Sequence, residues 1–338
     1  MIIIDGSEGE GGGQVLRYAC ALSLLTGEPF TIENIRGGRE KPGLMRQHVT
    51  AIEAACVVGG AECSGLAVGS THIGFRPGAV SPGDYHFAVG TAGSTSLVLQ
   101  TVMVPLMLAD APSRLVIEGG THALTAPPFD FIERTLLPII NRMGPTVTAK
   151  LVRHGFFPRG GGRIEIDIEP APLRAIECIE RGGAGPVQAT AIVAGIPFEV
   201  ANRELKTAQK VLAKWPAEAF VTRQVPADQG PGNALLLEAG FEHVTELMSG
   251  FGKLGVPAER LANTAAKRMM GYLASDAFAG PYLQDQLLLP MALARGGVFT
   301  TVKISEHTRT ASALIERFLG VGFRLTERKE GANLVEVA

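Results

Sequence analysis

The chain begins with MIIIDGSEGEGGGQVLRYACALSLLTGEPFTIENIRGGR (residues 1–39), in which an apolar strand, a glycine loop and an apolar helix lead to a second strand. The same order returns in YHFAVGTAGSTSLVLQTVMVPLMLADAPSRLVIEGG (residues 85–120). The glycine pairs that follow the two second strands, Gly37-Gly38 and Gly119-Gly120, lie about 80 residues apart. Such a period is too long for a solenoid repeat and suits a βαβαββ module.

Both copies continue in the same way. A second helix is predicted over residues 42–58 in the first copy and over residues 129–143 in the second, and a β-hairpin follows each. The first hairpin returns over residues 72–75, and the second spans residues 146–169. The C-terminal part supplies most of a third copy, with these predicted elements: a helix over 285–294, a strand over 298–304, a helix over 310–319 and a hairpin over 323–337.

One segment does not fit the repeat. Its apolar spacing predicts these elements: a strand over 187–193, a helix over 197–215, strands over 219–225 and 234–238, and a helix over 258–273. We therefore predict an α/β (α+β) fold with a core of three βαβαββ modules at residues 1–184 and 278–338. A small inserted βαββα domain is expected at residues 185–277.

The composition is that of a compact folded protein. Of 338 residues, 46% are apolar and 19% are charged, and the mean hydropathy is +0.20. These values exclude a disordered chain and a basic, nucleic-acid-wrapping tail. The 31 basic and 33 acidic residues give a net charge of −2. A polyanionic partner would therefore have to be bound by a local cluster of arginines.

The sequence indicates a cytoplasmic protein that does not enter a membrane. The first residues have no basic, apolar and small-residue pattern of an export signal. The most apolar stretch, residues 97–109, is interrupted by Gln100 and Pro105 and is shorter than the roughly 20 residues that a membrane span needs. The cysteines form no CxxC pair and are expected to be reduced core thiols: Cys20, Cys56, Cys63 and Cys178.

The first glycine loop, residues 6–13, precedes a helix and could present backbone N–H groups to an anion. Neither the P-loop nor the dinucleotide-binding pattern matches it. Glu8 and Glu10 lie in the loop and would repel a bare phosphate, so Glu10 is a candidate ligand of Mg²⁺ or Mn²⁺. The alternative is a plain strand-to-helix turn with solvated acids.

Basic residues gather around this loop. Arg17 lies one turn into the helix, and Arg36, Arg39, Lys41 and Arg46 follow the neighbouring strand. Because strand ends and helix starts share one edge of a βαβ unit, these cations are expected to converge there and to bind phosphates. A solvated charged face is the alternative.

His307 has the most unusual setting of the seven histidines. It follows an apolar strand within Ser305-Glu-His-Thr-Arg-Thr310 and directly precedes the helix predicted to begin at residue 310. A histidine there could bind phosphate, transfer protons or attack phosphorus, because neutral imidazole is a nucleophile without a separate base. An ordinary loop histidine remains the alternative.

The segment Tyr282-Leu283-Gln284-Asp285-Gln286 opens the first helix of the third module. Its aromatic, amide and carboxylate groups could hold a purine and a ribose, or Asp285 could cap the helix while Tyr282 packs in the core. The segment from Asp228 to Gly232 reads only as a turn. No Cys/His metal spacing, GxSxG elbow or zincin helix is present.

Taken together, these motifs resemble those of the RNA 3′-terminal phosphate cyclases over nearly the whole chain. The resemblance implies a core of three βαβαββ modules, as in the enolpyruvyl transferases, with a smaller inserted domain. The matching segments are Asp5-Gly6, Gly9 to Arg17, Lys41 to Leu44, Arg46 to His48, Ala92 to Ser94, Leu97 to Gln100, Arg153 to Phe156, Asp228 to Asn233, Tyr282 with Asp285-Gln286, and the His307 segment.

The resemblance also implies a three-step reaction of ATP with an RNA that ends in a 3′-phosphate. His307 would take AMP from ATP and release pyrophosphate, AMP would pass to the RNA phosphate, and the ribose 2′-OH would close a 2′,3′-cyclic phosphate. The residues that the resemblance assigns are His307 for catalysis, Gln100, Pro128, Tyr282, Leu283, Gln284, Asp285 and Gln286 for ATP, Arg17, Arg36, Arg39 and Gln47 for phosphates and the RNA end, and Glu10 for Mg²⁺ or Mn²⁺. No obligatory protein partner is evident.

Two other functions are compatible with this type of fold. The related ribosome-biogenesis paralogue binds RNA without catalysis and lacks the histidine nucleophile, so His307 argues against it. An enolpyruvyl transferase would need a cleft between two three-module domains, and this chain predicts one such domain. The residues after the histidine, Thr308-Arg309-Thr310-Ala311, depart from the family pattern, which commonly has an Asn there.

Overall fold

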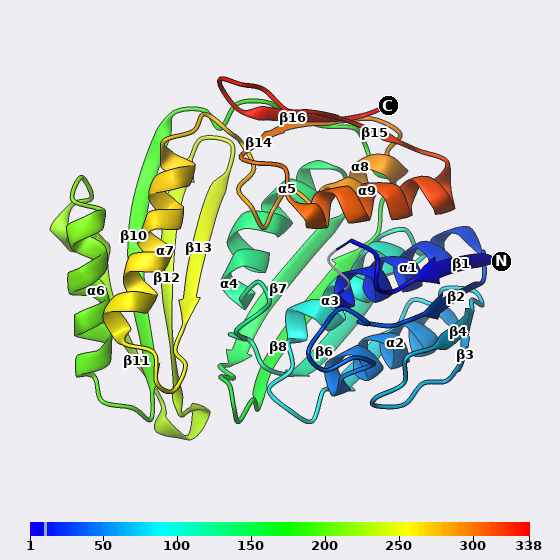
Figure 1. Ribbon diagram of the computed structural model, residues 1–338, viewed down its shortest axis with the longest axis horizontal. Coiled ribbons are helices and arrows are strands. Elements are labelled where there is room, and N and C mark those ends of the chain that lie inside the picture. Colours follow the sequence, from blue (N-terminus) through cyan, green and yellow to red (C-terminus); the bar gives the residue numbers. More distant parts are fainter. Residues whose placement is uncertain (10–11) are drawn as a thin grey trace.

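The computed structural model describes residues 1–9 and 12–338 of the chain. Within these residues it contains four mixed sheets of four strands each, covered by helices (Figure 1). This arrangement confirms the predicted α+β class. Among the described residues, no helix is long and apolar enough to cross a membrane.

The first module forms one sheet with the strand order β1-β2-β4-β3. Strands β1 and β2 are parallel, and the other pairs are antiparallel. The second helix begins four residues later than predicted, because Gly43 has a φ of +83° that a helix cannot contain. The elements are β1 Ile2–Asp5, α1 Gly13–Thr26, β2 Phe30–Glu33, α2 Arg46–Gly59, β3 Glu62–Ser64 and β4 Ile73–Arg76.

The second module repeats this topology with the order β5-β6-β8-β7. Its second helix is interrupted by a π-helical turn, because Pro138 has no N–H with which to continue the regular bonding pattern. The elements are β5 Asp84–Ala88, α3 Thr95–Met107, β6 Ser113–Gly119, α4 Phe129–Phe131, the π-turn Ile132–Leu136, α5 Leu137–Arg142, β7 Thr146–Arg153 and β8 Gly162–Glu169.

The third module has the order β9-β14-β16-β15, which is the same topology again. Its first strand, β9, pairs in parallel with β14. The two predicted helices are shifted: α8 begins three residues later than expected and α9 four residues earlier. The elements are β9 Glu177–Cys178, α8 Leu288–Leu293, β14 Val298–Thr301, α9 Glu306–Leu319, β15 Phe323–Thr326 and β16 Asn333–Val337. The predicted threefold repeat is confirmed.

A fourth sheet, β11-β10-β12-β13, lies between β9 and α8 in the chain and is called the inserted sheet below. The βαββα prediction missed β13, because this strand is buried on both faces and lacks the alternation by which strands were predicted. The domain boundaries at residues 185 and 277 remain predictions. The elements are β10 Ala184–Ala194, α6 Glu199–Val211, the 3₁₀ turn Ala217–Ala219, β11 Phe220–Val225, the 3₁₀ turn Ala227–Gln229, β12 Gly232–Phe241, β13 Thr245–Phe251 and α7 Ala258–Leu273.

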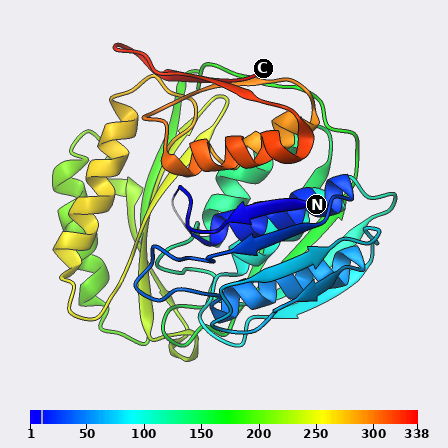
Figure 2. The same ribbon diagram turned by 45° about the vertical axis from the view of Figure 1, so that its right-hand side comes forward.

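The inserted sheet packs on both faces. On one face Leu235 and Leu237 contact the apolar side of α6 and α7, and on the other face Leu236 joins the main core. In that main core α1 packs against α2, α3 and α9, and α9 lies directly over α1 in both views (Figures 1 and 2). The starts of α1 and α9, although far apart in sequence, are therefore brought together.

Candidate active site

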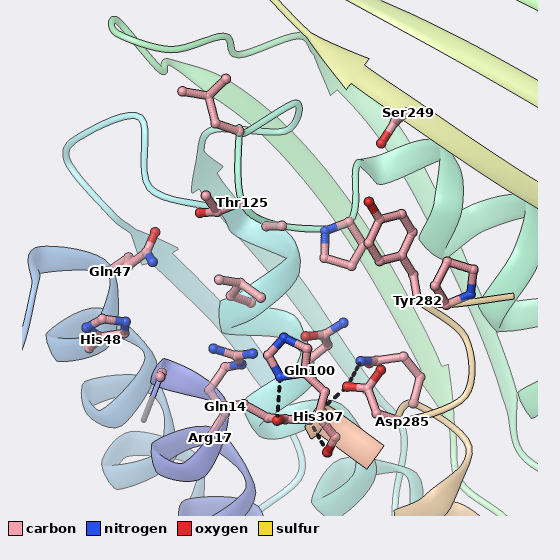
Figure 3. Close-up of a pocket in the computed structure, with 18 of the residues that line it drawn as sticks. Gln14, Arg17, Gln47, His48, Gln100, Thr125, Ser249, Tyr282, Asp285 and His307 are labelled. Carbon is pink, nitrogen blue, oxygen red and sulfur yellow. Dashed lines mark hydrogen bonds between the residues drawn. The ribbon is translucent and has the colours of Figure 1, made fainter. Parts of the chain in front are cut away.

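A cavity of about 540 Å³ opens where the three modules meet the inserted sheet (Figure 3). Its walls come from the starts of α1, α2 and α9, from α3, from the loop after β6, and from β13 and α7. The lining residues are Gly12, Gly13, Gln14, Arg17, Arg36, Arg39, Met45, Gln47, His48, Leu97, Gln100, Leu124, Thr125, Ala126, Pro127, Ser249, Gly250, Phe251, Arg268, Pro281, Tyr282, Asp285, Gln286 and His307.

The structure brings most of the sequence-predicted site residues into this one cavity. The predicted residues that line it are Arg17, Arg36, Arg39, Gln47, Gln100, Tyr282, Asp285, Gln286 and His307. Glu10, the predicted metal ligand, lies outside the described residues. The roles assigned to these side chains remain predictions.

Three predicted nucleotide-binding residues do not line the cavity. Leu283 is fully buried in the apolar core. Gln284 is also fully buried, and its Oε1 accepts hydrogen bonds from Ser305 N at 3.0 Å and from Thr308 Oγ1 at 2.8 Å. Pro128 precedes α4, and its neighbour Pro127 lines the cavity instead. Gln284 thus fixes the start of the helix that carries His307.

His307 lies in the first turn of α9, and the prediction that it precedes the helix is wrong. The helix starts earlier because Ser305 caps it, with Ser305 Oγ accepting a hydrogen bond from Thr308 N at 3.1 Å. The imidazole is thereby held on a regular element. Its Nδ1 faces Gln14 Oε1 at 2.9 Å, and the opposite side of the ring points into the cavity (Figure 3).

The contacts of Gln14 decide which ring nitrogen of His307 carries a proton. Gln14 Nε2 lies 2.9 Å from Asp285 Oδ2 and 3.3 Å from the main-chain oxygen of His307. Both partners are acceptors, so the amide group must direct Nε2 toward them and Oε1 toward the imidazole. Nδ1 therefore donates its proton to Oε1, and in the neutral ring Nε2 keeps a lone pair.

Asp285 sits behind Gln14 in a buried position. Burial raises the pKa of its carboxyl to about 6, although the charges of His307 and Arg17 partly oppose that rise. Its Oδ2 also accepts a hydrogen bond from Gln286 Nε2 at 2.9 Å. The hydroxyl of Tyr18 donates to its main-chain oxygen. These contacts fix the position of the carboxylate. The side-chain amide of Gln14 connects it to the imidazole of His307 by one hydrogen bond on each side.

Arg17 contributes a half-buried guanidinium to the cavity (Figure 3). Burial lowers its pKa to about 10, which leaves it charged at neutral pH. Among the described residues, no carboxylate forms an ion pair with it. A buried cation without such a partner is electrostatically suited to an anionic ligand.

Arg36 and Arg39 extend the positive wall. Arg36 Nη1 donates to the main-chain oxygens of Lys41 at 2.8 Å and Gly43 at 2.9 Å, which ties the loop after β2 together. Burial and the neighbouring charge of Arg39 lower the pKa of Arg36. Two like charges held close together raise the local positive potential, and an anion would relieve their repulsion.

His48 and Gln47 stand at the start of α2 (Figure 3). Burial, together with the charges of Arg17 and Arg36, lowers the pKa of His48 to about 3, so this ring is neutral. Its Nδ1 accepts a hydrogen bond from Met45 N at 3.0 Å. A Cβ at Gly13 would lie 2.5 Å from His48 Nε2, so only glycine allows α1 and α2 to approach this closely.

The opposite end of the cavity is more apolar and contains Tyr282. Its ring packs edge-on against Phe131 with centroids 6.3 Å apart, and its hydroxyl accepts a hydrogen bond from Arg268 Nη1 at 3.0 Å. Gln100 Nε2 is buried there without a hydrogen-bond partner among the described residues. An aromatic face beside an unused amide donor can hold a planar heterocycle.

Sequence reasoning missed the contributions of the inserted sheet and of the loop after β6. Ser249 and Phe251 come from β13, the strand that was not predicted, and Arg268 comes from α7. Thr125 and Pro127 come from the loop. The one available signal was the apolar pair Leu247-Met248 within β13. No local pattern could show that it faces a cavity.

The cavity therefore has a cationic end next to an oriented histidine and an aromatic end. Asp285 is the one carboxylate among the described lining residues, against four arginines. No group of three or more His, Cys, Asp or Glu among the described residues could hold a metal ion. The fold and the cavity define an α+β protein of three repeated modules, in which a histidine and four arginines line one cavity.

Comparison with known proteins specifies this class further. A sequence model of the family described as "RNA 3'-terminal phosphate cyclase" matches residues 8–325. The chain belongs to this family.

Three similar proteins are each named "RNA 3'-terminal phosphate cyclase". The protein of Koribacter versatilis (strain Ellin345) is 49% identical over 335 residues, which cover 99% of this chain and 94% of that protein. That of Ralstonia nicotianae (strain ATCC BAA-1114 / GMI1000) is 48% identical over 338 residues, covering 99% and 96%. That of Ectopseudomonas mendocina (strain ymp) is 47% identical over 336 residues, covering 99% and 98%.

Proposed function

We propose that this protein uses ATP to convert an RNA 3′-terminal phosphate into a 2′,3′-cyclic phosphodiester, through an AMP group carried on His307. The observation that carries the proposal is the hydrogen bond of 2.9 Å between His307 Nδ1 and Gln14 Oε1. It directs the lone pair of the imidazole into a cavity lined by arginines. The family and the names of the three relatives support the RNA substrate and the cyclisation.

In the first step His307 Nε2 attacks the α-phosphorus of ATP. A P–N bond forms, the bond from the α-phosphorus to the bridging oxygen breaks, and pyrophosphate leaves with the electron pair. The imidazole keeps its proton on Nδ1 and so becomes positively charged. Gln14 Oε1 accepts that proton's hydrogen bond at 2.9 Å, and the charge of Asp285 lies directly behind Gln14. Both groups stabilise the charge that develops on the ring.

In the second step an oxygen of the RNA 3′-phosphate attacks the same phosphorus. The P–N bond breaks and its electron pair returns to Nε2, which leaves the ring neutral again. The cationic imidazole is a good leaving group, and the RNA now ends in a mixed anhydride with AMP. A terminal phosphate has only poor leaving oxygens, so this transfer replaces one difficult displacement by easier ones.

In the third step the ribose 2′-OH attacks the 3′-phosphorus. The bond to AMP breaks, AMP leaves, the hydroxyl proton is lost to solvent, and a 2′,3′-cyclic phosphate remains. Because the nucleophile is the vicinal hydroxyl, only a ribose end can complete this step. Arg17, Arg36, Arg39 and Gln47 would hold the phosphates during all three steps, by positioning and by charge.

The remaining cavity residues fit the nucleoside of ATP. Tyr282 and Pro127 both line the cavity and offer flat apolar surfaces to adenine. Gln100 Nε2 would gain the partner that it lacks. A Mg²⁺ or Mn²⁺ ion remains part of the proposal as a companion of the nucleotide phosphates, whose oxygens are its preferred ligands. It would neutralise charge on the triphosphate, and Glu10 is its proposed protein ligand.

The direct test is incubation of the protein with α-labelled ATP and a divalent ion. We expect label on the wild-type protein and none on His307→Ala. His72→Ala is the matched control, because His72 is exposed and does not line the cavity. It should be labelled like the wild type. A wild-type protein that stays unlabelled contradicts the proposal and favours a binding-only role.

A second experiment tests the substrate. An RNA that ends in a 3′-phosphate should become resistant to phosphatase and release AMP when the protein and ATP are added. A DNA end of the same sequence lacks the 2′-OH, so it can receive AMP but should not release it again. Phosphate release from phosphoenolpyruvate and an acceptor sugar would instead favour transferase chemistry. Release of AMP from the capped DNA end would contradict the role of the 2′-OH.

A further inference from the structure

Two of the sequence segments that resemble the family lie outside the candidate active site. These are Arg153 to Phe156 at the end of β7 and Asp228 to Asn233, which leads into β12. They are distant in the sequence, and the structure brings them into contact. We propose that Arg153, His154, Asp228 and Gln229 form an interdomain latch, which positions one wall of the ATP cavity; the inference rests on the proposed function.

Arg153 is the centre of the latch. Its Nη1 lies 2.8 Å from Asp228 Oδ2, its Nη2 donates to the main-chain oxygen of Asp228 at 2.7 Å, and its Nε donates to the main-chain oxygen of Gly161 at 3.0 Å. The side chain of Asp228 is 63% exposed, so its ion pair is screened by water and salt. The two bonds to main-chain oxygens therefore determine the geometry.

The second half of the latch is buried. Gln229 Oε1 accepts hydrogen bonds from His154 N at 3.0 Å and from His154 Nδ1 at 3.2 Å. Burial lowers the pKa of His154 to about 4, so the ring is neutral and donates through Nδ1. A Cβ at Gly232 would lie 2.3 Å from Phe156 Cβ, which shows how closely the two segments pack. A small movement of one segment must therefore displace the other.

The latch lies at the end of the inserted sheet that reaches the cavity. Ala234, near the start of β12, pairs with Phe251 at the end of β13. Phe251 and Ser249 line the cavity. In Figure 1 this end of β13 and the end of β7 point to the same, lower edge of the molecule. The latch anchors the turn before β12, and β12 pairs with β13. The latch therefore fixes the position of the cavity-lining residues of β13.

His122 connects the latch to the opposite wall. Its ring stacks on that of His154 with centroids 5.2 Å apart and lies 5.3 Å from Phe156 and 6.5 Å from Phe251. Its Nε2 is 2.9 Å from Asp130 Oδ2, which holds the ring in place. The loop that begins at His122 continues into the cavity-lining residues 124–127. One cluster of rings thus sets the separation of the two walls.

Other contacts hold the inserted sheet at its far end. Arg142 Nη1 donates to the main-chain oxygen of His243 at 3.1 Å, in the turn between β12 and β13. Arg134 forms an ion pair of 2.5 Å with Glu238 in the second half of β12. These contacts keep the sheet attached when the latch is broken. Loss of the latch should therefore shift the cavity wall without unfolding the protein.

The test compares three variants of the full-length protein by the rate of transfer of labelled AMP from ATP. Arg153→Ala removes every contact of the guanidinium and should raise the half-saturating ATP concentration about tenfold, or about 1.4 kcal/mol. Asp228→Asn keeps the main-chain acceptor and should raise it no more than about twofold. Arg142→Ala, the matched control at the far end, should leave it unchanged.

The rate at saturating ATP separates positioning from general damage. His307 and the arginines beside it lie on other elements, so this rate should stay within about twofold of the wild type in all three variants. If Arg153→Ala lowers the saturating rate and the thermal midpoint together without a change in half-saturation, the latch is only structural. Should that variant destabilise the protein, Gln229→Ala provides the same comparison.

Two outcomes separate this inference from the proposed function. If the wild-type protein takes no label from ATP, the proposed function fails, and binding of α,β-methylene-ATP by calorimetry tests the latch instead. We expect Arg153→Ala to weaken that binding about tenfold. If the wild type is labelled and Arg153→Ala has the half-saturation of the wild type, the latch alone is refuted.

Discussion

Replacing Gln14 with leucine tests the orientation of His307 most sharply. Leucine has a similar volume but neither accepts from His307 Nδ1 nor donates to Asp285, two contacts of 2.9 Å each. Gln14 is only 5% exposed, so water cannot readily replace the lost partners. The variant should fold, because leucine fills a similar volume and Asp285 keeps its contacts with Gln286 and Tyr18.

The magnitude follows from the hydrogen bond that is lost. A bond to a group that becomes charged is worth about 1.5–3 kcal/mol, and here it strengthens as AMP transfer makes the imidazole positive. With about 1.4 kcal/mol for each factor of ten, the rate of AMP transfer to His307 should fall about tenfold to a hundredfold. Since Gln14 supplies no cation to the phosphates, the affinity for ATP should change by less than about threefold.

The assay is a single-turnover measurement of labelled AMP transfer at saturating ATP, with binding of α,β-methylene-ATP measured separately. Gln209→Leu is the matched control, because Gln209 is exposed on α6 and far from the cavity. It should react like the wild type. A Gln14→Leu protein with the wild-type transfer rate and intact nucleotide binding would refute the orienting role of Gln14.

Three further outcomes are expected. The pKa of Asp285 is raised to about 6, so its carboxyl is charged at pH 7.5, where Asp285→Asn should slow AMP transfer about tenfold. At pH 5 both side chains are neutral, and the rates of the wild type and the variant should approach each other. A rate ratio that does not change with pH would contradict the role of the charge. Burial raises the pKa of Glu246 to about 8, so its contribution to stability is fully present below pH 4.5 and is lost as the pH rises through 8. Denaturant unfolding should show a decline of up to about 5 kcal/mol over this range, and Glu246→Gln should abolish it. The same decline in the variant would contradict this assignment. Gly13→Ala would place a Cβ 2.5 Å from His48 Nε2 and 3.2 Å from Arg17 Nη1, so both side chains would have to shift. Calorimetry should then show an affinity for α,β-methylene-ATP that is reduced about tenfold. An affinity equal to that of the wild type would show that these side chains move freely.

The threefold repeat could be predicted because short-range sequence patterns show each of its elements. Apolar strands, glycine loops and apolar helices recur in the same order, and the sheets of the three modules share the predicted connectivity. The sequence also predicted that Arg17 and Arg36 lie close together, and both line the cavity. The prediction was possible because strand ends and helix starts share one edge of a βαβ unit. His307 was found because it follows an apolar strand, although its place within α9 was not.

The start of α9 shows how a local signal was passed over. Ser305 is a favourable N-cap and Glu306 an acidic residue in the first turn, and both indicate a helix that begins before residue 310. The prediction followed apolar spacing, which starts only with Ala311. Capping residues therefore give the boundary of such a helix better than its buried face does.

Other features of the site have no local signal. Gln14 and Asp285 are separated by 271 positions in the chain, and no pattern around Gln14 indicates its contact with a carboxylate or an imidazole. The contribution of β13 to the cavity depends on how the inserted sheet docks. Leu283 illustrates the reverse case, because it lies in a segment of site residues and yet belongs to the core.

In the proposed intermediate, Nε2 of His307 carries AMP while Nδ1 keeps its proton and donates it to Gln14. NMR of protein labelled with ¹⁵N in its histidines, after reaction with ATP, measures both nitrogens at once. We predict a one-bond coupling between phosphorus and Nε2 of His307, together with a protonated Nδ1. An adduct on Nδ1, on another side chain, or on no residue would contradict this account.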